Sequence, residues 1–125
     1  MLIDTDVLIW MMRGHAGAAA LLQTLLPWRI SAVTYMELAQ GCRNKQELAR
    51  AKKGLSLCRT EILPVSATIS DRAVQLIDAY ALSHGLQVGD ALIAATAIEH
   101  GLPVLTANTK HFGQIESLQV VAFVP

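Results

Sequence analysis

The sequence predicts one α/β domain with a central, mainly parallel sheet of four to five strands flanked by helices on both faces. Short apolar or β-branched segments alternate along the chain with longer segments of helical periodicity, a pattern typical of parallel strands joined by helices. The composition, 53% hydrophobic and 16% charged, is that of a folded chain and not of a disordered one. Because 125 residues is close to the commonest domain size, we expect residues 1–125 to form a single domain.

Five short segments are predicted to be strands because they are apolar or β-branched and are followed by turn-forming or helix-opening residues. They are residues 2–3, 29–31, 61–65, 104–106 and 118–123. Pro64 places the third of them near an edge of the sheet, because proline has no N–H to donate to a neighbouring strand. A loop is expected over residues 107–113.

The helices are predicted from apolar residues that recur three and four positions apart. They are expected to include residues 7–10, 18–26, 36–39, 44–58, 69–81 and 88–100. Asp6 is expected to cap the first helix, Pro27 to end the second, and Ser31 or Thr34 to cap the third. Gly85 suits the position just beyond the end of the helix at 69–81.

The charge of the chain is balanced, with ten acidic residues and ten lysines and arginines, so no overall positive field attracts nucleic acid. Six of the basic residues nevertheless fall within residues 43–59. They are Arg43, Lys45, Arg50, Lys52, Lys53 and Arg59. This segment is either a modest basic patch or simply a solvated helix face.

Cysteine usage and hydropathy predict a soluble, cytoplasmic protein. Cys42 and Cys58 lack a Cys-x-x-Cys spacing, so we expect two reduced thiols and no zinc site. The sequence has no run of 18 apolar residues, and Asp4 and Asp6 interrupt the N-terminal segment where a signal peptide would be apolar.

Three acidic residues, Asp4, Glu37 and Asp90, lie in apolar surroundings instead of on a solvent face. Each is expected at or just after a strand or loop that opens a helix, where the helix N-terminus favours a negative charge and a carboxylate is ready to bind a cation. Asp4 directly follows the predicted strand 2–3, at the position where open α/β sheets bind their ligands. These three residues are therefore candidate metal ligands.

Structural explanations compete with that hypothesis. Glu37 with Thr34 matches the Thr-x-x-Glu capping box, and Asp90 is explained as a first-turn acid that complements the helix dipole. Asp6 is better explained as a helix cap than as a catalyst. No capping pattern covers Asp4, and an acid directly after a buried strand needs a partner.

Four stretches of the sequence together resemble the PIN domain, and specifically the VapC-type ribonuclease toxins of bacterial toxin–antitoxin pairs. In chain order they read LIDTDVLIW, ISAVTYMELAQGCRN, HGLQVGDALIAATAIEHGLPVLTANTKHF and LQVVAFVP, and they cover nearly the whole chain. The resemblance implies a PIN-like three-layer fold and the activity of a metal-dependent endoribonuclease, a hydrolase of RNA phosphodiester bonds.

By that resemblance, Asp4, Glu37 and Asp90 are the catalytic acids that bind Mg²⁺ or Mn²⁺. Three carboxylates about 5 Å apart repel by roughly 3 kcal/mol per pair at an effective dielectric near 20. A hard divalent cation neutralises such a cluster through oxygen ligands. It also activates a water molecule and orients the phosphate, which phosphodiester hydrolysis requires.

The accessory positions include two departures from the family pattern. Thr5 is similar to a family hydroxyl near the metal or phosphate, and Asp6 is its acidic neighbour. Asn108 falls at the fourth family position, where many PIN domains have aspartate, and an amide is a weaker, neutral oxygen ligand. His111 stands where similar toxins often have aspartate, so it is a candidate only for RNA contact.

The resemblance also implies partners: an RNA substrate, a second copy of the chain, and a cognate antitoxin whose tail enters the acidic groove. The apolar helices within residues 7–26 and 44–58 are candidate partner surfaces, although they are also explained as covers for the sheet. Candidate RNA contacts are Arg13, Arg43, Lys110 and His111. Phosphate contacts position a substrate without specifying its sequence, so the RNA target stays open.

Two other functions fit parts of the sequence. A haloacid-dehalogenase-like phosphatase has an Asp-x-Asp motif like Asp4-Thr5-Asp6, but this chain has no lysine between Gly54 and Asn108, where that family needs one. The second alternative is a catalytically degenerate PIN-like module that binds RNA or a partner. Asn108 favours such a module, whereas the three retained acids favour the nuclease.

Overall fold

The fold is built on a five-stranded sheet whose central strand, β1 (Leu2–Ile3), is also the first element of the chain. The structure, a computed structural model, describes residues 1–125. The sheet has the order β3-β2-β1-β4-β5, and all neighbouring strands are parallel. The other strands are β2 (Arg29–Ser31), β3 (Glu61–Leu63), β4 (Val104–Thr106) and β5 (Val120–Ala122). The predicted fold class is confirmed, and β3 lies at an edge, as Pro64 indicated.

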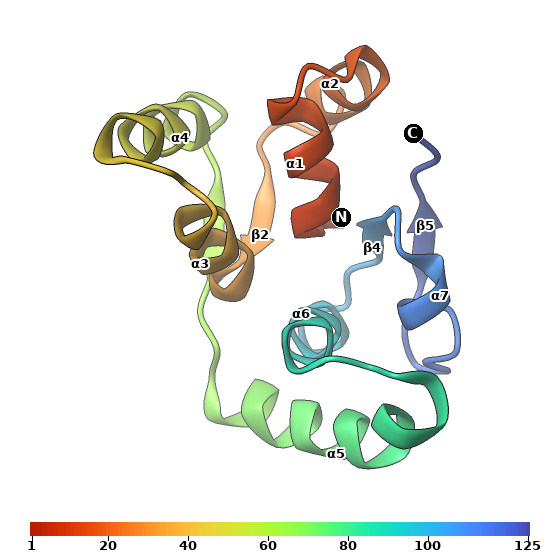
Figure 1. The fold of residues 1–125 in the computed structure, drawn as a ribbon. Helices are drawn as coiled ribbons and strands as arrows, with labels where there is room; N and C mark the ends of the chain where they lie inside the picture. Colours follow the sequence, from red (N-terminus) through yellow and green to blue (C-terminus); the bar gives the residue numbers. More distant parts are fainter.

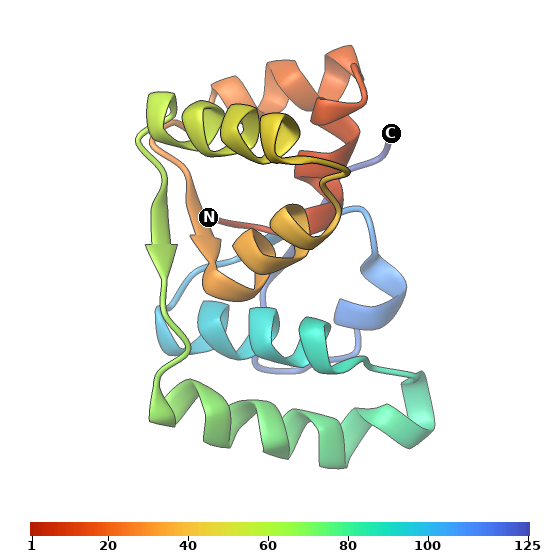
Figure 2. The same ribbon diagram turned by 60° about the vertical axis from the view of Figure 1, so that its left-hand side comes forward.

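Seven helices connect and cover the strands. They are α1 (Thr5–Met12), α2 (Ala16–Gln23), α3 (Ala32–Gln40), α4 (Lys45–Leu57), α5 (Ala67–His84), α6 (Val88–Glu99) and α7 (Thr109–Phe112). Figure 1 shows α5 and α6 on one side of the sheet, α1, α2 and α4 on the other, and α3 between the two groups. The second view, Figure 2, shows the same layering. None of the helices combines the length and apolar character that crossing a bilayer requires.

The sheet separates two hydrophobic clusters. Successive strand residues point to opposite faces, so Leu2 packs in the cluster with α5 and α6, whereas Ile3 packs in the cluster with α1, α2 and α4. Helix α3 contributes to both, with Val33 in the first cluster and Leu38 in the second. Helix α3 is therefore anchored on both sides of the sheet, which fixes the side chains on its remaining face.

The start of α1 corrects one prediction. Asp4, and not Asp6, is the N-cap: its Oδ1 accepts a hydrogen bond of 2.8 Å from the backbone N–H of Thr5. The helix begins at Thr5 because Asp4 leaves the strand in an extended conformation and can cap at once. Asp6 consequently lies in the first turn of the helix, where its carboxylate is free for other partners.

The start of α3 corrects a second prediction. Ser31, the last residue of β2, is the N-cap, and its hydroxyl accepts from the backbone N–H of Val33 at 3.0 Å. Thr34 is inside the helix, so the proposed Thr34–Glu37 capping box is wrong. Glu37 lies in the middle of α3 and not at the N-terminus of that helix.

The remaining differences concern element ends. Helix α2 ends at Gln23 instead of residue 26, and the indole N–H of Trp28 donates to the backbone oxygen of Leu22 at 2.8 Å near that end. The strands predicted at 61–65 and 118–123 are shorter, and the predicted loop 107–113 contains α7. Helix α5 closes at Gly85, which has the left-handed φ of 70° that its predicted role requires.

Candidate active site

The candidate site lies at the carboxyl ends of β1 and β4, the neighbouring strands between which the strand order of the sheet reverses. Open α/β sheets bind ligands in the crevice at such a switch point. The backbone N–H of Asp4 donates to the carbonyl of Leu105 at 2.9 Å, so the first residue after β1 stays beside β4. The side chains of Asp4 and Thr106 therefore emerge next to each other, as the position of Asp4 in the sequence suggested.

Asp4 and Asp6 share one hydroxyl partner. The Oγ1 atom of Thr106 lies 2.7 Å from Oδ2 of Asp4 and 3.4 Å from Oδ2 of Asp6. The backbone N–H of Ala107 also donates to Oδ2 of Asp6, at 3.1 Å. The other carboxylate oxygen of Asp6, Oδ1, is buried and has no hydrogen-bond partner. A buried polar atom without a partner is costly, so Oδ1 of Asp6 is available to a ligand at this position.

Burial makes the two carboxylates hard to ionise. The pKa of Asp4 is raised from its ordinary 3.8 to about 7, mostly by burial and also by the negative charges of Asp6 and Asp90. Hydrogen bonds from Thr106 and Thr5 act in the opposite direction. Burial also raises the pKa of Asp6. A cation between these carboxylates would relieve both the burial cost and the repulsion.

Glu37 reaches the site from α3 through a pair of buried threonines. Its Oε1 lies 2.6 Å from the hydroxyl of Thr5, and that hydroxyl lies 3.0 Å from the hydroxyl of Thr34. Because an ionised carboxylate only accepts, the proton of Thr5 goes to Glu37, and Thr34 donates to the oxygen of Thr5. Thr5 therefore orients Glu37, and it does so from the residue next to Asp4.

The other oxygen of Glu37 packs against the first turn of α6. A Cβ placed on Gly89 would lie 3.2 Å from Oε2 of Glu37, tighter than most real contacts of this kind. Glycine at this position therefore leaves room for the Glu37 carboxylate next to Asp90.

Asp90 contacts His111, which the sequence suggested only as a candidate for RNA contact. Asp90 lies in the first turn of α6, and its Oδ2 is 3.4 Å from the backbone N–H of Gln87, a long bond that partly supports the structural explanation. The Nδ1 atom of His111 is closer, 3.1 Å from Oδ2 of Asp90. The same Nδ1 lies 3.0 Å from the side-chain amide of Asn108.

The predicted site residues thus fall into three groups, and the contacts are between members of the same group. Asp4 and Asp6 meet at Thr106, Glu37 meets Thr5, and Asp90 meets His111 with Asn108. No three acidic, histidine or cysteine side chains converge closely enough in this structure to coordinate one cation.

The basic candidates lie at the surface. Arg13, Arg43 and Lys110 are exposed, and Arg43 pairs with Glu47 at 3.1 Å. All six basic residues of the 43–59 segment are exposed, which fits either the basic patch or the solvated face.

Sequence reasoning did not identify Thr106 or Gly89. Thr106 is the polar last residue of an otherwise apolar strand, the same signal that singled out Asp4 one strand away. Gly89 precedes Asp90 and was indistinguishable from an ordinary glycine near a helix start. The role of Gly89 depends on how closely α3 approaches the start of α6, and the sequence around Gly89 does not encode that distance.

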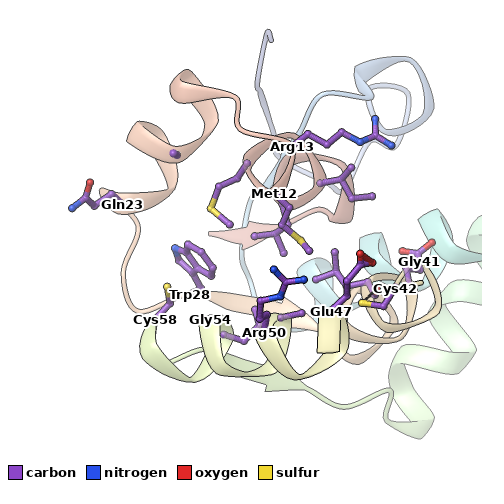
Figure 3. Close-up of a pocket in the computed structure, with 18 of the residues that line it drawn as sticks. Met12, Arg13, Gln23, Trp28, Gly41, Cys42, Glu47, Arg50, Gly54 and Cys58 are labelled. Atoms are coloured by element: carbon purple, nitrogen blue, oxygen red, sulfur yellow. Dashed lines mark hydrogen bonds between the residues drawn. The ribbon is translucent and has the colours of Figure 1, made fainter. Parts of the chain in front are cut away.

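A groove of about 900 Å³ lies beside the carboxylates, between α1, α2, α3 and α4. Of its 19 lining residues, 12 are hydrophobic. Figure 3 shows Met12 and Arg50 directed into this space, with Trp28 farther along it. Glu37 also lines the groove, so the groove and the acidic site meet at this residue.

Known proteins resemble this chain over almost its whole length. The family model of the PIN domain matches residues 1–117. Ribonuclease VapC10 of Mycobacterium tuberculosis is 34% identical over 128 residues, covering 99% of this chain and 94% of the relative. Ribonuclease VapC19 of the same organism is 33% identical over 123 residues, covering 94% and 96%.

Solved structures give the same result. A toxin–antitoxin complex from Klebsiella pneumoniae contains a chain that superposes with a TM-score of 0.81 at 33% identity, covering 97% of this chain and 95% of that one. FitAcB from Neisseria gonorrhoeae superposes with a TM-score of 0.74 at 28% identity. With the family model and relatives matching over almost the whole length, the chain belongs to the PIN domain family.

Proposed function

We propose that this protein is a divalent-metal-dependent endoribonuclease, the toxin of a toxin–antitoxin pair, which hydrolyses RNA phosphodiester bonds and is inhibited by a cognate antitoxin. Similarity to ribonucleases VapC10 and VapC19 supports the class of reaction. The observation that carries the proposal is the pair of carboxylates at the sheet switch point, Asp4, which is buried, and Asp6, which is half-buried, with the pKa of Asp4 raised to about 7. Family membership removes the phosphatase alternative.

The chemistry of the site residues fits a hard divalent cation, Mg²⁺ or Mn²⁺, although their spacing in this structure does not bring three of them together around one ion. The side chains that would hold it are Asp4, Glu37 and Asp90, and the candidate accessory ligands Asp6 and Asn108 also offer oxygen atoms, the donors that these cations prefer. The buried Oδ1 of Asp6, which has no partner, is an additional reason to expect a ligand here. When bound, the cation would supply an activated water and would neutralise charge on the reacting phosphate.

The protein's own groups would prepare the site in three ways. The hydroxyl of Thr106 holds Asp4 in place and favours its ionised form, because a hydrogen bond to the charged form lowers the pKa. The hydroxyl of Thr5 orients Glu37. We assign Arg13 and Lys110, exposed on α1's end and on α7, to RNA phosphates, which they would position without reading the sequence.

The test is cleavage of a structured RNA in Mg²⁺. We expect cleavage by wild type and at least about a 100-fold loss in Asp4→Asn, Glu37→Gln and Asp90→Asn, because each loses a charged ligand. Asp71→Asn and Asp78→Asn, exposed acids on α5, are matched controls and should cut normally. Site variants that cut as fast as wild type, or cleavage that persists in EDTA, would overturn the proposal. Mapping the new ends across total RNA would then identify the target.

The groove between α1, α2, α3 and α4 is our proposed site for the antitoxin. A related chain of known structure comes from a toxin–antitoxin complex, and the groove here is apolar and ends at Glu37. An apolar antitoxin segment would fill it, and a basic side chain beyond that segment would approach Asp4 and Asp90 and weaken Mg²⁺ binding. Unchanged Mg²⁺ affinity in the complex would contradict this placement.

Two alanines of α4 provide a matched test of the groove. Ala51 lines it, whereas Ala49 is exposed on the same helix outside it. Ala51→Arg should abolish copurification with the antitoxin and leave RNA cleavage intact, while Ala49→Arg should preserve both. Equal complex formation by the two variants would place the antitoxin elsewhere.

We also propose that the chain pairs with a second copy. Large apolar side chains are exposed on α5 and at the start of α6, including Val74, Leu82 and Val88. Exposed apolar surface of this kind favours association. Sedimentation should give a dimer that Leu82→Glu dissociates, and a monomeric wild type would exclude it.

A module that binds RNA without cutting it remains the second candidate, favoured by the amide of Asn108 in place of a carboxylate. It predicts RNA binding without cleavage in wild type and a gain of cleavage in Asn108→Asp. Cleavage by wild type would exclude it.

A further inference from the structure

His111 and Asn108, the two positions of the candidate site that depart from the family pattern, contact each other. From α7, the Nδ1 atom of His111 reaches Oδ2 of Asp90 at 3.1 Å and the side-chain amide of Asn108 at 3.0 Å. The side chains of His111 and Asp90 are only 28% and 19% exposed, so water competes little for this contact. Asn108 is itself fixed, because its backbone N–H donates to Oγ1 of Thr106 at 2.9 Å.

The chemistry of these partners determines which atom carries the proton. An ionised carboxylate only accepts hydrogen bonds, so the Nδ1 atom of His111 must carry hydrogen and donate it to Asp90. An amide NH₂ cannot donate to a nitrogen that already bears hydrogen. The amide of Asn108 therefore presents its oxygen to His111, since the two ends of an amide are alike in shape and are assigned from their partners.

Two oxygen atoms, one from Asp90 and one from Asn108, thus converge on a single N–H group. Convergent oxygens of this kind are what a cation would otherwise hold together. A neutral imidazole is sufficient here, because the donor is an N–H and no charge on the ring is required. The short helix α7 places this N–H on the side of Asp90 that faces Asn108.

We propose that the N–H of His111 takes the place of a second cation between Asp90 and Asn108, so that each chain binds one divalent cation. His111 is then a positioning residue, which acts through Asp90 and touches neither substrate nor metal. This inference rests on the proposed function, since it assigns the cation count of the same site. It replaces the role in RNA contact that the sequence suggested for His111.

The decisive measurement is the number of Mn²⁺ ions bound per chain, obtained by calorimetry and by electron paramagnetic resonance of the free ion. We expect one ion for wild type and two for Asn108→Asp/His111→Asp, which replaces the N–H with a carboxylate and adds a second one. His100→Asp, on an exposed residue just beyond the other end of α6, is the control and should bind one.

Two results would overturn the inference while leaving the proposed function intact: two ions in wild type, or one ion in the double variant with its fold preserved. A wild type that binds no Mn²⁺ would overturn both this inference and the proposed function. Asp4→Asn helps to distinguish failure of this inference alone from failure of the proposed function as well, because this variant should lose the single ion that wild type binds.

A second test does not depend on the double variant folding. Nitrogen-15 NMR of the His111 ring should report hydrogen on Nδ1, both without divalent cation and in Mg²⁺. Hydrogen on Nε2 with a bare Nδ1 would contradict the inference.

Kinetics provide the third readout. His111→Ala should lower kcat about 10-fold with little change in KM, a typical effect of losing a residue that orients a metal ligand. His111→Asn should restore part of the rate, because its amide offers a donor near the position of Nδ1. Equal rates for wild type and His111→Ala would exclude a positioning role.

Discussion

The hydroxyl of Thr106 donates a 2.7 Å hydrogen bond to the carboxylate of Asp4, so the last residue of β4 holds the acid that follows β1. Both side chains are buried, and 102 positions separate them in the sequence. This bond lowers the pKa of Asp4, whereas burial raises it. The ionisation of Asp4 near neutral pH therefore depends on a residue from the far end of the chain.

Removing that hydroxyl should shift the pH dependence of activity. Thr106→Val keeps the shape of the side chain but loses a hydrogen bond to a charged group, worth about 1.5–3 kcal/mol. The pKa of Asp4 then rises further, and the acidic limb of the pH–rate profile moves to higher pH by about one unit, since one unit corresponds to about 1.4 kcal/mol. RNA cleavage measured from pH 5 to 9 provides the profile.

Thr96→Val is the matched control for this experiment. Thr96 is also buried, but its hydroxyl donates to the backbone oxygen of Leu92 within α6, at 2.7 Å. The pH–rate profile of Thr96→Val should overlay that of wild type. An unshifted profile for Thr106→Val would mean that the hydroxyl does not control Asp4.

Asp4→Asn should stabilise the protein at high pH in the absence of divalent cations. Below about pH 4, Asp4 is protonated in both the folded and the unfolded chain and affects neither. As the pH rises from its unfolded pKa of 3.8 to about 7, ionisation favours the unfolded chain, so stability is lost across this window and stays low above it. Asparagine removes this penalty, worth up to about 4 kcal/mol, and can still cap α1.

Urea unfolding in EDTA, followed by tryptophan fluorescence, tests this expectation. Asp4→Asn should exceed wild type at pH 8 and match it at pH 4, while Asp71→Asn should match wild type at both. Mg²⁺ should stabilise wild type at pH 8 and have no effect on Asp4→Asn, since a ligand stabilises only the state that binds it. A variant less stable than wild type at pH 8 would refute the assigned burial cost.

The hydroxyl of Thr5 should matter through Glu37. Thr5→Val removes the 2.6 Å hydrogen bond to Oε1 of Glu37 and should lower kcat about 10-fold with little effect on KM. Thr5→Ser keeps a hydroxyl and should recover most of the rate. Full activity in Thr5→Val together with a loss in Thr5→Ser would mean that packing of the Thr5 methyl group, and not the hydrogen bond, is what the site needs.

Gly89→Ala should impair the site without unfolding the protein. The new Cβ would lie 3.2 Å from Oε2 of Glu37, so the carboxylate must move by a few tenths of an ångström. We expect a 10-fold or greater loss of cleavage with an unfolding free energy within about 1 kcal/mol of wild type, since alanine favours helix by about that amount. Gly54→Ala, in open space on α4, should gain stability and keep full activity.

The sequence was sufficient for the layers and for Asp4. Each layer is encoded locally, by apolar strands and by helices with one apolar face. Asp4 stood out because an acid directly after a buried strand has no local explanation. The caps were harder to assign, since Asp4 and Asp6, or Ser31 and Thr34, offer equivalent local chemistry. In each pair, the path of the strand that precedes the helix decides which of the two residues is the cap.

The contacts of the site could not be read from the sequence. Whether Asp6 faces solvent or Thr106 depends on β4 lying beside β1, which is a property of the strand order. His111 reaches Asp90 only because α7 forms where the sequence suggested a loop. These contacts join distant segments, and no periodicity or capping pattern carries that information.

The strand order also has a consequence for how the protein is made. β1 is synthesised before the other strands, yet its neighbour β4 and the residues that complete the site come from the last third of the chain. Domains fold as units during synthesis. Asp4 therefore cannot lie beside Thr106 and Asp90 until nearly all of the chain has emerged from the ribosome. On the proposed function, a growing chain would therefore be harmless to the messenger and the ribosome that are producing it, and a product truncated before β4 would not become a nuclease.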